Sequence, residues 1–467
     1  MILSPLGIKL NNTSDLCCFY GGSWFTYEDL YSLASHYSFL IRPRTVSLVV
    51  GANSLHVLAF YLACLSRNSP LVLLPNTLSK VILDRYLLDF YPRQLFNFDS
   101  DYLIGSNYKL QDDYLAVCHD APTLDQQHDL PALLLPTSGS TGTRKLVKVS
   151  FDNLRSNTKS IIEYLRLTSL SRHICSLPFS YTYGLSCINT HLSVGASLIL
   201  NDYSLIDSCF WDLVSNLRPT TISGVPYTYQ TLARFKRDRL ISLPFTQYTQ
   251  AGGKLSSKLV KYFYGIASDS SAEFIVMYGQ TEATARMSYL PFDSSSTKVG
   301  SIGVPIPSGS FTIDVFDELP HINSHPCGEL VYSGPNVTHG YASSLSDIYI
   351  VSPAPKFLRT GDLAFQDSDG FYFIIGRISR FAKINGIRIS LDDLESQSGL
   401  ADIACVSDDN YVYVFHSSTL QPSEVLASLK SHSSLPSRVF RLVPLDSIPR
   451  NDSGKVDYPS LNSRISQ

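Results

Sequence analysis

The sequence has 467 residues, of which 44% are hydrophobic and 16% are charged. This length and composition predict two or three domains with large hydrophobic cores and exclude a disordered chain. The formal net charge of −3 excludes a global basic field of the kind that nucleic-acid-binding proteins use.

Nine cysteines are scattered along the sequence, with no CxxC pair and no Cys/His cluster at zinc-binding spacing. An odd, dispersed set of this kind indicates reduced thiols in a cytoplasmic protein. The N-terminal residues lack a basic region followed by an apolar core, so we expect no signal peptide. No run of about twenty apolar residues occurs, so we expect no membrane span.

The first third of the sequence alternates between apolar strands and helices. Thr26 is a plausible N-cap, with Glu28 close behind it. Strands are predicted at 46–50, 70–74 and 132–135, and helices at 23–43, 54–66 and 78–91. This βαβ alternation is typical of a parallel sheet covered by helices.

A segment of small and hydroxyl-bearing residues follows the strand at 132–135. It reads Thr137-Ser-Gly-Ser-Thr-Gly-Thr-Arg-Lys145. Its glycines let the backbone approach an anion, its N–H and hydroxyl groups can donate to phosphate oxygens, and Arg144 and Lys145 add positive charge. It is not a Walker A loop, because no Gly-Lys-Ser/Thr follows at the required spacing. A flexible Ser/Gly connector is the alternative interpretation.

The middle of the sequence continues the alternation. Helices are predicted at 153–165, 206–217 and 255–264, and strands at 174–177, 198–200, 220–224, 246–249 and 274–277. Three aromatic residues and a glycine in Pro178–Ser186 indicate a pocket wall, although aromatics in a simple core are the commoner case. The strand at 274–277 leads directly into Tyr278-Gly-Gln-Thr-Glu282.

From about residue 300 the sequence changes to short strands and turns, which predict a β-rich, largely antiparallel subdomain. The segment at 376–388 is dense in charge. The remainder predicts a small α+β domain with helices at 390–396 and 422–429 and strands at 403–406 and 411–415.

Motifs in a fixed order resemble those of the adenylate-forming (AMP-binding) superfamily, which includes acyl-CoA synthetases, peptide-synthetase adenylation domains and luciferases. They are Thr137–Lys145, Pro178–Leu185, Tyr278–Glu282, Gly328–Glu329 with Gly340–Tyr341, Thr360–Asp362, Gly376–Arg377, Lys383–Arg388 and Pro449–Lys455.

The resemblance implies an α/β fold with a large N-terminal AMP-binding domain, residues 1–378. That domain would contain two parallel-sheet α/β subdomains and the β-rich subdomain at about 300–378. A mobile α+β domain, residues 379–467, would follow and carry the catalytic lysine.

The resemblance also implies a two-step reaction. A carboxylate attacks the α-phosphate of ATP, which gives an acyl-adenylate and pyrophosphate, and a thiol then takes the acyl group and releases AMP. The expected ATP- and AMP-binding residues are Thr137, Ser138, Gly139, Ser140, Thr141, Gly142, Tyr278, Gly279, Gln280, Thr281, Asp362 and Arg377.

Individual roles follow from the resemblance. The loop at 137–145 would hold the β- and γ-phosphates, Tyr278 would stack on adenine, and Asp362 would hold the ribose hydroxyls. Arg377 would reach the ribose or the α-phosphate region. The expected catalytic residues are Lys145, Glu282, which would hold Mg²⁺, and Lys455, which would bridge the carboxylate and the α-phosphate. The alternatives are a helix-starting carboxylate for Glu282, an Asx-turn for Asp362 and one more exposed lysine for Lys455.

The small C-terminal domain is expected to reorient between the two steps about a hinge at Ser379, where the family more often has Asp or Lys. Lys383 and Gly386 would then border the thiol tunnel. Arg144 is a second departure, since the family usually has proline before the loop lysine.

The expected acyl pocket is formed by Tyr181, Tyr183, Gly252, Gly253 and Gly303, with ordinary packing as the alternative. Ser180 follows Phe179 where peptide-synthetase domains for α-amino acids carry Asp, which disfavours an amino acid. The stretch 178–196 weakly resembles acyl-CoA ligases of bacterial surface-polysaccharide pathways, which suggests a short or hydroxylated acid.

The sequence ends shortly after Lys455, so we expect the thiol in trans, from CoA or from a phosphopantetheinyl carrier. The predicted function is an AMP-forming acyl-CoA synthetase that uses ATP, Mg²⁺ and CoA, with no nucleic-acid partner. The alternatives are a stand-alone adenylation enzyme that loads a carrier protein, a non-catalytic binding relative and a luciferase-like enzyme.

Overall fold

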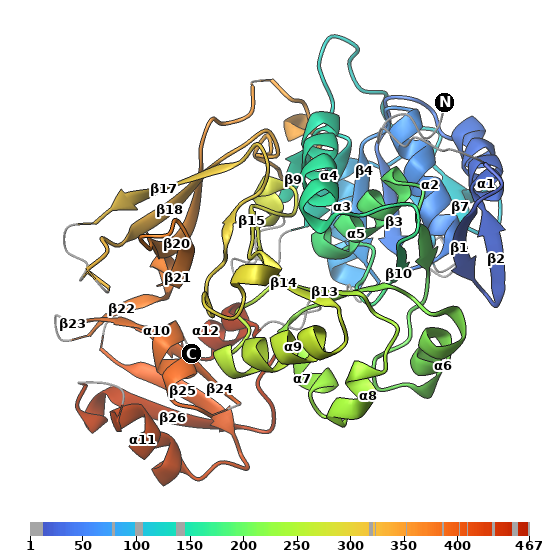
Figure 1. The fold of residues 1–467 in the computed structure, drawn as a ribbon. Coiled ribbons are helices and arrows are strands. Elements are labelled where there is room, and N and C mark those ends of the chain that lie inside the picture. Colours follow the sequence, from blue (N-terminus) through green and yellow to red (C-terminus); the bar gives the residue numbers. More distant parts are fainter. Residues whose placement is uncertain are drawn as a thin grey trace. The chain divides into compact units, whose positions relative to one another are not determined.

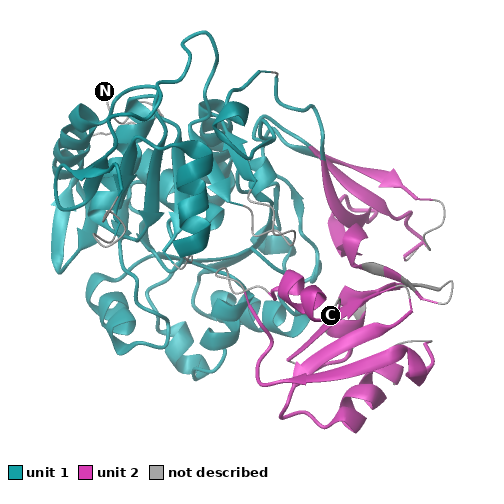
Figure 2. Cartoon of the chain, turned by 180° about the vertical axis from the view of Figure 1, so that it is seen from behind, with its two compact units in different colours: residues 1–137, 144–310, 333–358 teal, residues 138–143, 311–332, 359–467 magenta. Residues whose placement is uncertain are grey.

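The computed structural model of the chain describes residues 13–76, 80–98, 106–136, 145–316, 321–322, 324–351, 353–384, 387–400, 402–408, 410–431, 435–450 and 456–465. The chain forms two compact units (Figure 2). Unit 1 comprises residues 1–137, 144–310 and 333–358, and unit 2 comprises residues 138–143, 311–332 and 359–467. The predicted domain boundary at 378/379 stays a prediction.

The larger sheet of unit 1 has nine strands, parallel at the centre and antiparallel at both edges. They are β1 (Leu16–Tyr20), β2 (Ser23–Thr26), β10 (Arg172–Ile174), β11 (Ser197–Ile199), β12 (Thr221–Gly224), β13 (Gln247–Gln250), β14 (Glu273–Tyr278), β15 (Ser288–Tyr289) and β16 (Val304–Pro305). Their order is β16-β15-β14-β13-β12-β10-β11-β1-β2.

The second sheet of unit 1 has eight strands, and its central strands are also parallel. They are β3 (Ser47–Gly51), β4 (Leu71–Pro75), β5 (Gln94–Phe96), β6 (Lys109–Leu110), β7 (Leu115–Val117), β8 (Leu133–Pro136), β9 (Leu146–Val149) and β19 (Tyr341–Ala342). Their order is β19-β9-β8-β4-β3-β5-β7-β6.

Helices cover both faces of these sheets. They are α1 (Tyr27–Leu40), α2 (Leu55–Ser66), α3 (Lys80–Phe90), α4 (Phe151–Leu165), α5 (Thr182–Ser193), α6 (Ser208–Leu217), α7 (Pro226–Leu232), α8 (Arg237–Ile241) and α9 (Ser257–Asp269). The 3₁₀ turns of unit 1 are η3 (Thr281–Ala283), η4 (Phe292–Ser294) and η5 (Leu345–Asp347).

Helices α2 and α5 are buried along almost their whole length, in a core that includes residues of both sheets. A helix buried on every side must lie between other layers. Along β3, Val49 belongs to this shared core, whereas Leu48 belongs to the core beneath α3. Helices α6 to α9 cover the other face of the nine-stranded sheet (Figure 1). Unit 1 is therefore layered, with helices between the sheets and outside them.

Unit 2 contains three smaller sheets. Their strands are β17 (Ser310–Val315), β18 (Gly328–Ser333), β20 (Leu358–Gln366) and β21 (Tyr372–Arg377), in that order; the pair β22 (Phe381–Ile384) and β23 (Ile387–Ser390); and β24 (Ile403–Ser407), β25 (Val412–Ser417) and β26 (Phe440–Leu445). Its helices are α10 (Leu391–Gln397), α11 (Pro422–Ser431) and α12 (Tyr458–Ile465), with 3₁₀ turns η6 (Ile378–Arg380) and η7 (Ser437–Val439).

One local prediction is wrong, and one helix was not predicted. Residues 23–26 form strand β2 rather than the start of a helix, and α1 begins at Tyr27, where Thr26 and Asp29 form a reciprocal capping box. Helix α5 was not predicted, because it contains a glycine, a cysteine and two threonines, all poor helix formers. Its burial between two sheets overrides that weak propensity.

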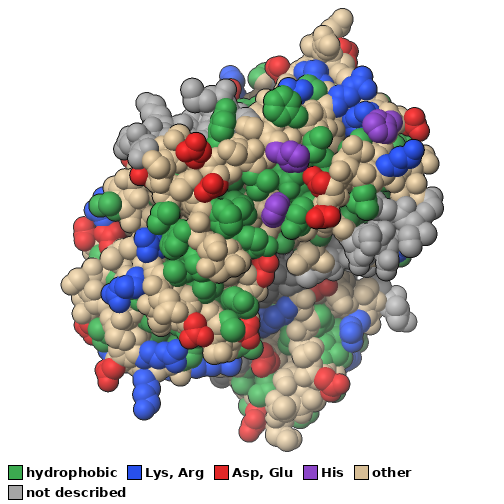
Figure 3. All heavy atoms as spheres, turned by 90° about the vertical axis from the view of Figure 1, so that its right-hand side faces the viewer, with side chains coloured by type: hydrophobic (Ala, Val, Ile, Leu, Met, Phe, Trp, Pro, Cys, Tyr) green, Lys and Arg blue, Asp and Glu red, His purple; other side chains and the backbone are tan. Residues whose placement is uncertain are grey.

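All nine cysteines are free. Within the described ranges, no helix is both long and apolar enough to span a bilayer. On the face shown in Figure 3, acidic and basic side chains are interspersed.

Two helical glycines predict opposite effects for the same substitution. A Cβ at Gly184 in α5 would lie 2.3 Å from the carbonyl oxygen of Pro178, so Gly184→Ala should lower stability by ~1–3 kcal/mol. At Gly265 in α9, the nearest atom is 3.4 Å away, in the side chain of Arg237, so Gly265→Ala should raise stability by ~0.5–1 kcal/mol. Urea and thermal unfolding would measure both, and shifts of the same sign would contradict this account of α5.

Candidate active site

The motif Tyr278–Glu282 lies where β14 ends and η3 begins, at one end of the nine-stranded sheet. Tyr278 is half-buried, and its hydroxyl accepts a hydrogen bond from Nε2 of Gln280 at 3.3 Å. Gly279 passes so close to the backbone of Ala285 that a Cβ would lie 2.0 Å from the Ala285 carbonyl oxygen. Only glycine fits this turn, which places Tyr278, Gln280 and Thr281 beside one another.

Glu282 is held by a segment that follows it by more than fifty residues. The backbone N–H and the hydroxyl of Thr338 both donate to the Glu282 carbonyl oxygen at 3.0 Å. The Tyr341 hydroxyl donates to Oε1 of Glu282 at 2.8 Å. Burial and the neighbouring carboxylate raise the pKa of Tyr341, so it stays protonated and remains a donor. The Glu282 carboxylate is therefore fixed in orientation.

Glu282 could bind a divalent cation only if a substrate supplied further ligands. Among the residues that the structure describes, no group of three or more His, Cys, Asp and Glu side chains could hold a metal alone. Mg²⁺ is commonly held by one or two carboxylates together with substrate phosphates and water. Glu282 fits that mode of binding.

Asp362 and Arg377 lie opposite each other in unit 2, in the antiparallel pair β20 and β21. Arg377 Nε donates to Oδ1 of Asp362 at 2.9 Å, and the two side chains are 57% and 4% exposed. The preceding turn is fixed by Glu329, whose Oε1 accepts from the Gly361 N–H at 3.1 Å. A buried carboxylate thus holds an exposed guanidinium, so that the carboxylate can accept and the guanidinium can donate hydrogen bonds to a ligand.

Several predicted residues lie outside the described part of the chain: Thr137, Ser138, Gly139, Ser140, Thr141, Gly142, Arg144, Gly386 and Lys455. Lys145 is exposed and directly precedes β9. Ser379 is exposed in η6, and Lys383 lies in β22.

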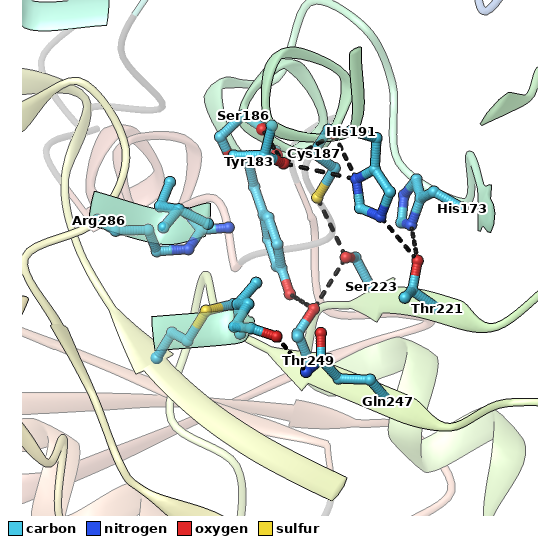
Figure 4. Close-up of a pocket in the computed structure, with 14 residues that line it drawn as sticks. His173, Tyr183, Ser186, Cys187, His191, Thr221, Ser223, Gln247, Thr249 and Arg286 are labelled. Atoms are coloured by element: carbon cyan, nitrogen blue, oxygen red, sulfur yellow. Dashed lines mark hydrogen bonds between the residues drawn. The ribbon is translucent and has the colours of Figure 1, made fainter. Parts of the chain in front are cut away.

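A buried polar cavity lies between α5 and strands β12 to β14 (Figure 4). Tyr183 projects into it, and its hydroxyl lies 2.9 Å from Oγ1 of Thr249. Ser223 continues this chain of hydroxyls, 2.8 Å from Thr249 and 3.1 Å from the Cys187 thiol. The free volume is about 10 Å³, which is room for about one water-sized group.

Two histidines close the far side of the cavity and share one hydroxyl. Thr221 Oγ1 lies 3.0 Å from His173 Nδ1 and 3.1 Å from His191 Nε2. His191 Nδ1 lies 2.7 Å from the carbonyl oxygen of Cys187 and must be its protonated nitrogen. Burial lowers the pKa of His191 to about 4 and lowers that of His173 as well, so both are neutral at pH 7.

The predicted acyl-pocket residues divide between this cavity and close packing. Tyr183 lines the cavity, whereas Tyr181, Gly252, Gly253 and Gly303 are not among the residues around it. Gly252 contacts the Tyr181 hydroxyl, which a Cβ would approach to 2.5 Å, and Gly253 lies against Pro226. A Cβ at Gly303 would lie 1.8 Å from the carbonyl oxygen of Tyr289. Their assignment as pocket walls stays a prediction.

Comparison with known proteins identifies the family. Residues 9–342 match the family described as AMP-binding enzyme. The chain belongs to the AMP-binding enzyme family. Its relatives include oxalate–CoA ligase from Arabidopsis thaliana, 27% identical over an alignment of 365 residues that covers 73% of this chain and 69% of that protein. A second is 4-coumarate–CoA ligase-like 6 from the same plant, 25% identical over 71% of this chain and 62% of that protein.

The crystal structure of ATP-bound MatB from Rhodopseudomonas palustris superposes with a TM-score of 0.81 at 21% identity, covering 100% of this chain and 99% of that one. At this identity the likeness shows the fold alone. The predicted superfamily, the α/β fold class and the class of AMP-binding enzyme are confirmed. The named relatives are CoA ligases, in agreement with the predicted acid–thiol ligase.

Arg286 is a further cavity residue of this AMP-binding enzyme that was not predicted from the sequence. Its guanidinium carbon lies 3.8 Å from the centre of the Tyr183 ring. The available signal was a lone charge in the stretch Ala283-Thr-Ala-Arg-Met287. A single arginine among small residues is equally typical of a surface loop, so Arg286 could be recognised only once its burial was known.

The buried His191 predicts a loss of stability in acid. Its pKa is about 4 in the folded protein and near 6.5 in the unfolded chain, so the unfolded state binds the proton first as the pH falls. The contribution, roughly 3 kcal/mol, is fully present above about pH 6.5 and is lost as the pH approaches 4. Thermal unfolding from pH 7.5 to 4 should show a shallower decline for His191→Gln than for the wild type. Parallel curves would contradict the assignment.

Proposed function

We propose that the protein is an ATP-dependent acid–CoA ligase that acts in the cytoplasm on a small carboxylic acid. A carboxylate oxygen attacks the α-phosphorus of ATP, and the bond to pyrophosphate breaks. The thiol sulfur of CoA then attacks the acyl carbon, AMP leaves, and the thiol proton passes to solvent. The observation that carries the proposal is the family match over residues 9–342, together with a Glu282 carboxylate fixed by Tyr341.

Individual roles follow from the resemblance and from the geometry within each unit. Tyr278 stacks on adenine, and Glu282 would hold Mg²⁺. Asp362 holds the ribose hydroxyls, and Arg377 reaches the ribose or the α-phosphate region. Mg²⁺ would neutralise phosphate charge as the carboxylate approaches. The loop at 137–145 grips the β- and γ-phosphates, and Lys455 bridges the two reacting anions. Ser379 serves as the hinge of the 379–467 domain, with Lys383 and Gly386 beside the thiol path.

The likeness of residues 178–196 favours a short or hydroxylated acid. The role in surface-polysaccharide biosynthesis rests on the likeness of residues 178–196 alone. A separate carrier protein is the alternative acceptor.

The deciding experiment is ATP–pyrophosphate exchange over a panel of acids, followed by the same panel with CoA or a phosphopantetheinyl carrier. We expect exchange with at least one acid and thioester formation with CoA. No exchange with any acid would contradict the proposed reaction, and thioester formation only on the carrier would replace CoA as the acceptor.

Lys455→Ala should remove the positive charge that stabilises the transition state of adenylation. We expect acyl-adenylate formation to fall at least ~100-fold, while thioester formation from preformed adenylate largely survives. Lys258→Ala, which removes an exposed lysine from α9, is the matched control. Equal losses in both half-reactions would reject the role of Lys455.

The loop at 137–145 should matter for adenylation and much less for the thiol step. Lys145→Ala should raise the KM for ATP about tenfold, because it removes one charge-assisted phosphate contact. Lys148 is a contrasting neighbour, since its ammonium donates to the backbone carbonyls of Asp347 and Tyr349 at 3.0 Å. Lys148→Ala should therefore lower the Tm without a selective effect on ATP. A Lys145 variant impaired only in the thiol step would show that the loop is misassigned.

A further inference from the structure

Arg286 carries a positive charge into the interior of unit 1. It lies between η3 and β15, is 3% exposed, and its guanidinium faces the ring of Tyr183 (Figure 4). Its Nη1 donates to the carbonyl oxygen of Ala285 at 3.3 Å. Its Nε is buried and has no hydrogen-bond partner among the described residues. One stacking contact and one long hydrogen bond leave most of this cation's capacity for hydrogen bonding unused.

The backbone at this position is firmly held. Asn157 of α4 donates to the Arg286 carbonyl oxygen at 2.9 Å and accepts from the Arg286 N–H at 3.3 Å. Asn336 donates to the same carbonyl oxygen at 2.9 Å. The burial of Arg286 therefore follows from a fixed main-chain position rather than from a freely placed surface loop.

No negative charge faces the guanidinium from the cavity. The described residues around the cavity include no Asp and no Glu. Burial keeps His173 and His191 neutral by lowering their pKa values, and it keeps Tyr183 and Cys187 neutral by raising theirs. An isolated charge in a protein interior is costly unless it meets an opposite charge and hydrogen bonds. A ligand anion would supply both.

We propose that the acid activated by this enzyme carries a second carboxylate, remote from the one that is adenylated, and that Arg286 binds this second carboxylate. This inference rests on the proposed function, because it names the substrate class of the same reaction. The second carboxylate would enter the cavity beside Tyr183, on the side that Arg286 lines. A carboxylate at this place would pair with the guanidinium and give the unsatisfied Nε an acceptor. The hydroxyls of Tyr183, Thr249 and Ser223 provide further polar surroundings.

The test compares acids that differ only at the remote end: malonate with propionate, succinate with butyrate, and glutarate with pentanoate. Succinamate, which ends in a neutral amide, separates charge from polarity. In ATP–pyrophosphate exchange, we expect one dicarboxylate to exceed its monocarboxylate partner at least ~100-fold in kcat/KM, since a site built for a polar group rejects the analogue that lacks it. Arg286→Met should abolish that preference, and Arg286→Lys should keep part of it.

Arg239→Met is the matched control, because Arg239 also stacks on aromatic rings, those of Trp211 and Phe235, but is exposed. It should leave the preference unchanged. If Arg286→Met does not fold, as judged by its Tm, Arg286→Lys decides alone. A smaller preference for the dicarboxylate than in the wild type supports the inference, and an unchanged preference overturns it.

The outcomes separate this inference from the proposed function. Exchange that favours the monocarboxylates or succinamate, with no change in Arg286→Met, overturns the inference and leaves the ligase intact. If no acid of this set exchanges, the wider panel of acids described above decides the proposed function, and binding of the second carboxylate is then read directly as a ligand-induced rise in Tm. A rise with a dicarboxylate that Arg286→Met loses supports the anion site, and no rise overturns it.

Discussion

The conformation of the loop between β14 and β15, which carries Glu282 and Arg286, depends on hydrogen bonds to its buried backbone carbonyl groups. Between β14 and β15 the chain turns through Thr284 with a positive φ of 67°. The stretch 336–341 provides its partners: Asn336 donates to the carbonyl oxygens of Ala283 and Arg286, and Thr338 donates to that of Glu282. Buried backbone groups left unpaired would each cost free energy comparable to a lost hydrogen bond. The same stretch continues into β19 at the edge of the eight-stranded sheet, so the segment that carries Glu282 is tied to both sheets of unit 1.

Much of this architecture follows from local sequence. Strands β3, β4 and β14 and helices α2, α4 and α9 lie close to their predicted positions, because their apolar periodicity and turn residues agree with their burial. Helix α5 could not be predicted in this way, since its stability comes from two sheets that are brought together only by the fold. Among the site residues, Glu282 was assigned by its motif, whereas its fixation by Tyr341 depends on a contact between residues 59 positions apart. Arg286 was not predicted, because its burial depends on contacts with Asn157 and Asn336, which are distant in the sequence.

In unit 2, the residue after the proposed hinge is strongly anchored. Arg380 bonds to Glu395, Asp392 and the carbonyl oxygen of Cys405, and it stacks on the ring of Tyr458 at 3.8 Å. Glu395 in turn accepts from the Tyr458 hydroxyl. This network joins η6 to α10, β24 and α12. A rotation at the exposed Ser379 would therefore be transmitted to the sheet that follows it rather than absorbed locally.

The close approach at Gly303 limits which substitutions the predicted acyl pocket could accept. Because any side chain there would collide with the main chain of Tyr289, a saturation library at this position would return only the parent residue among folded variants. In the proposed acyl site, room for a different acid would have to come from side chains around the cavity, such as Met277 or Cys187. The contact between the backbones at Gly303 and Tyr289 therefore excludes position 303 as a site for directed evolution.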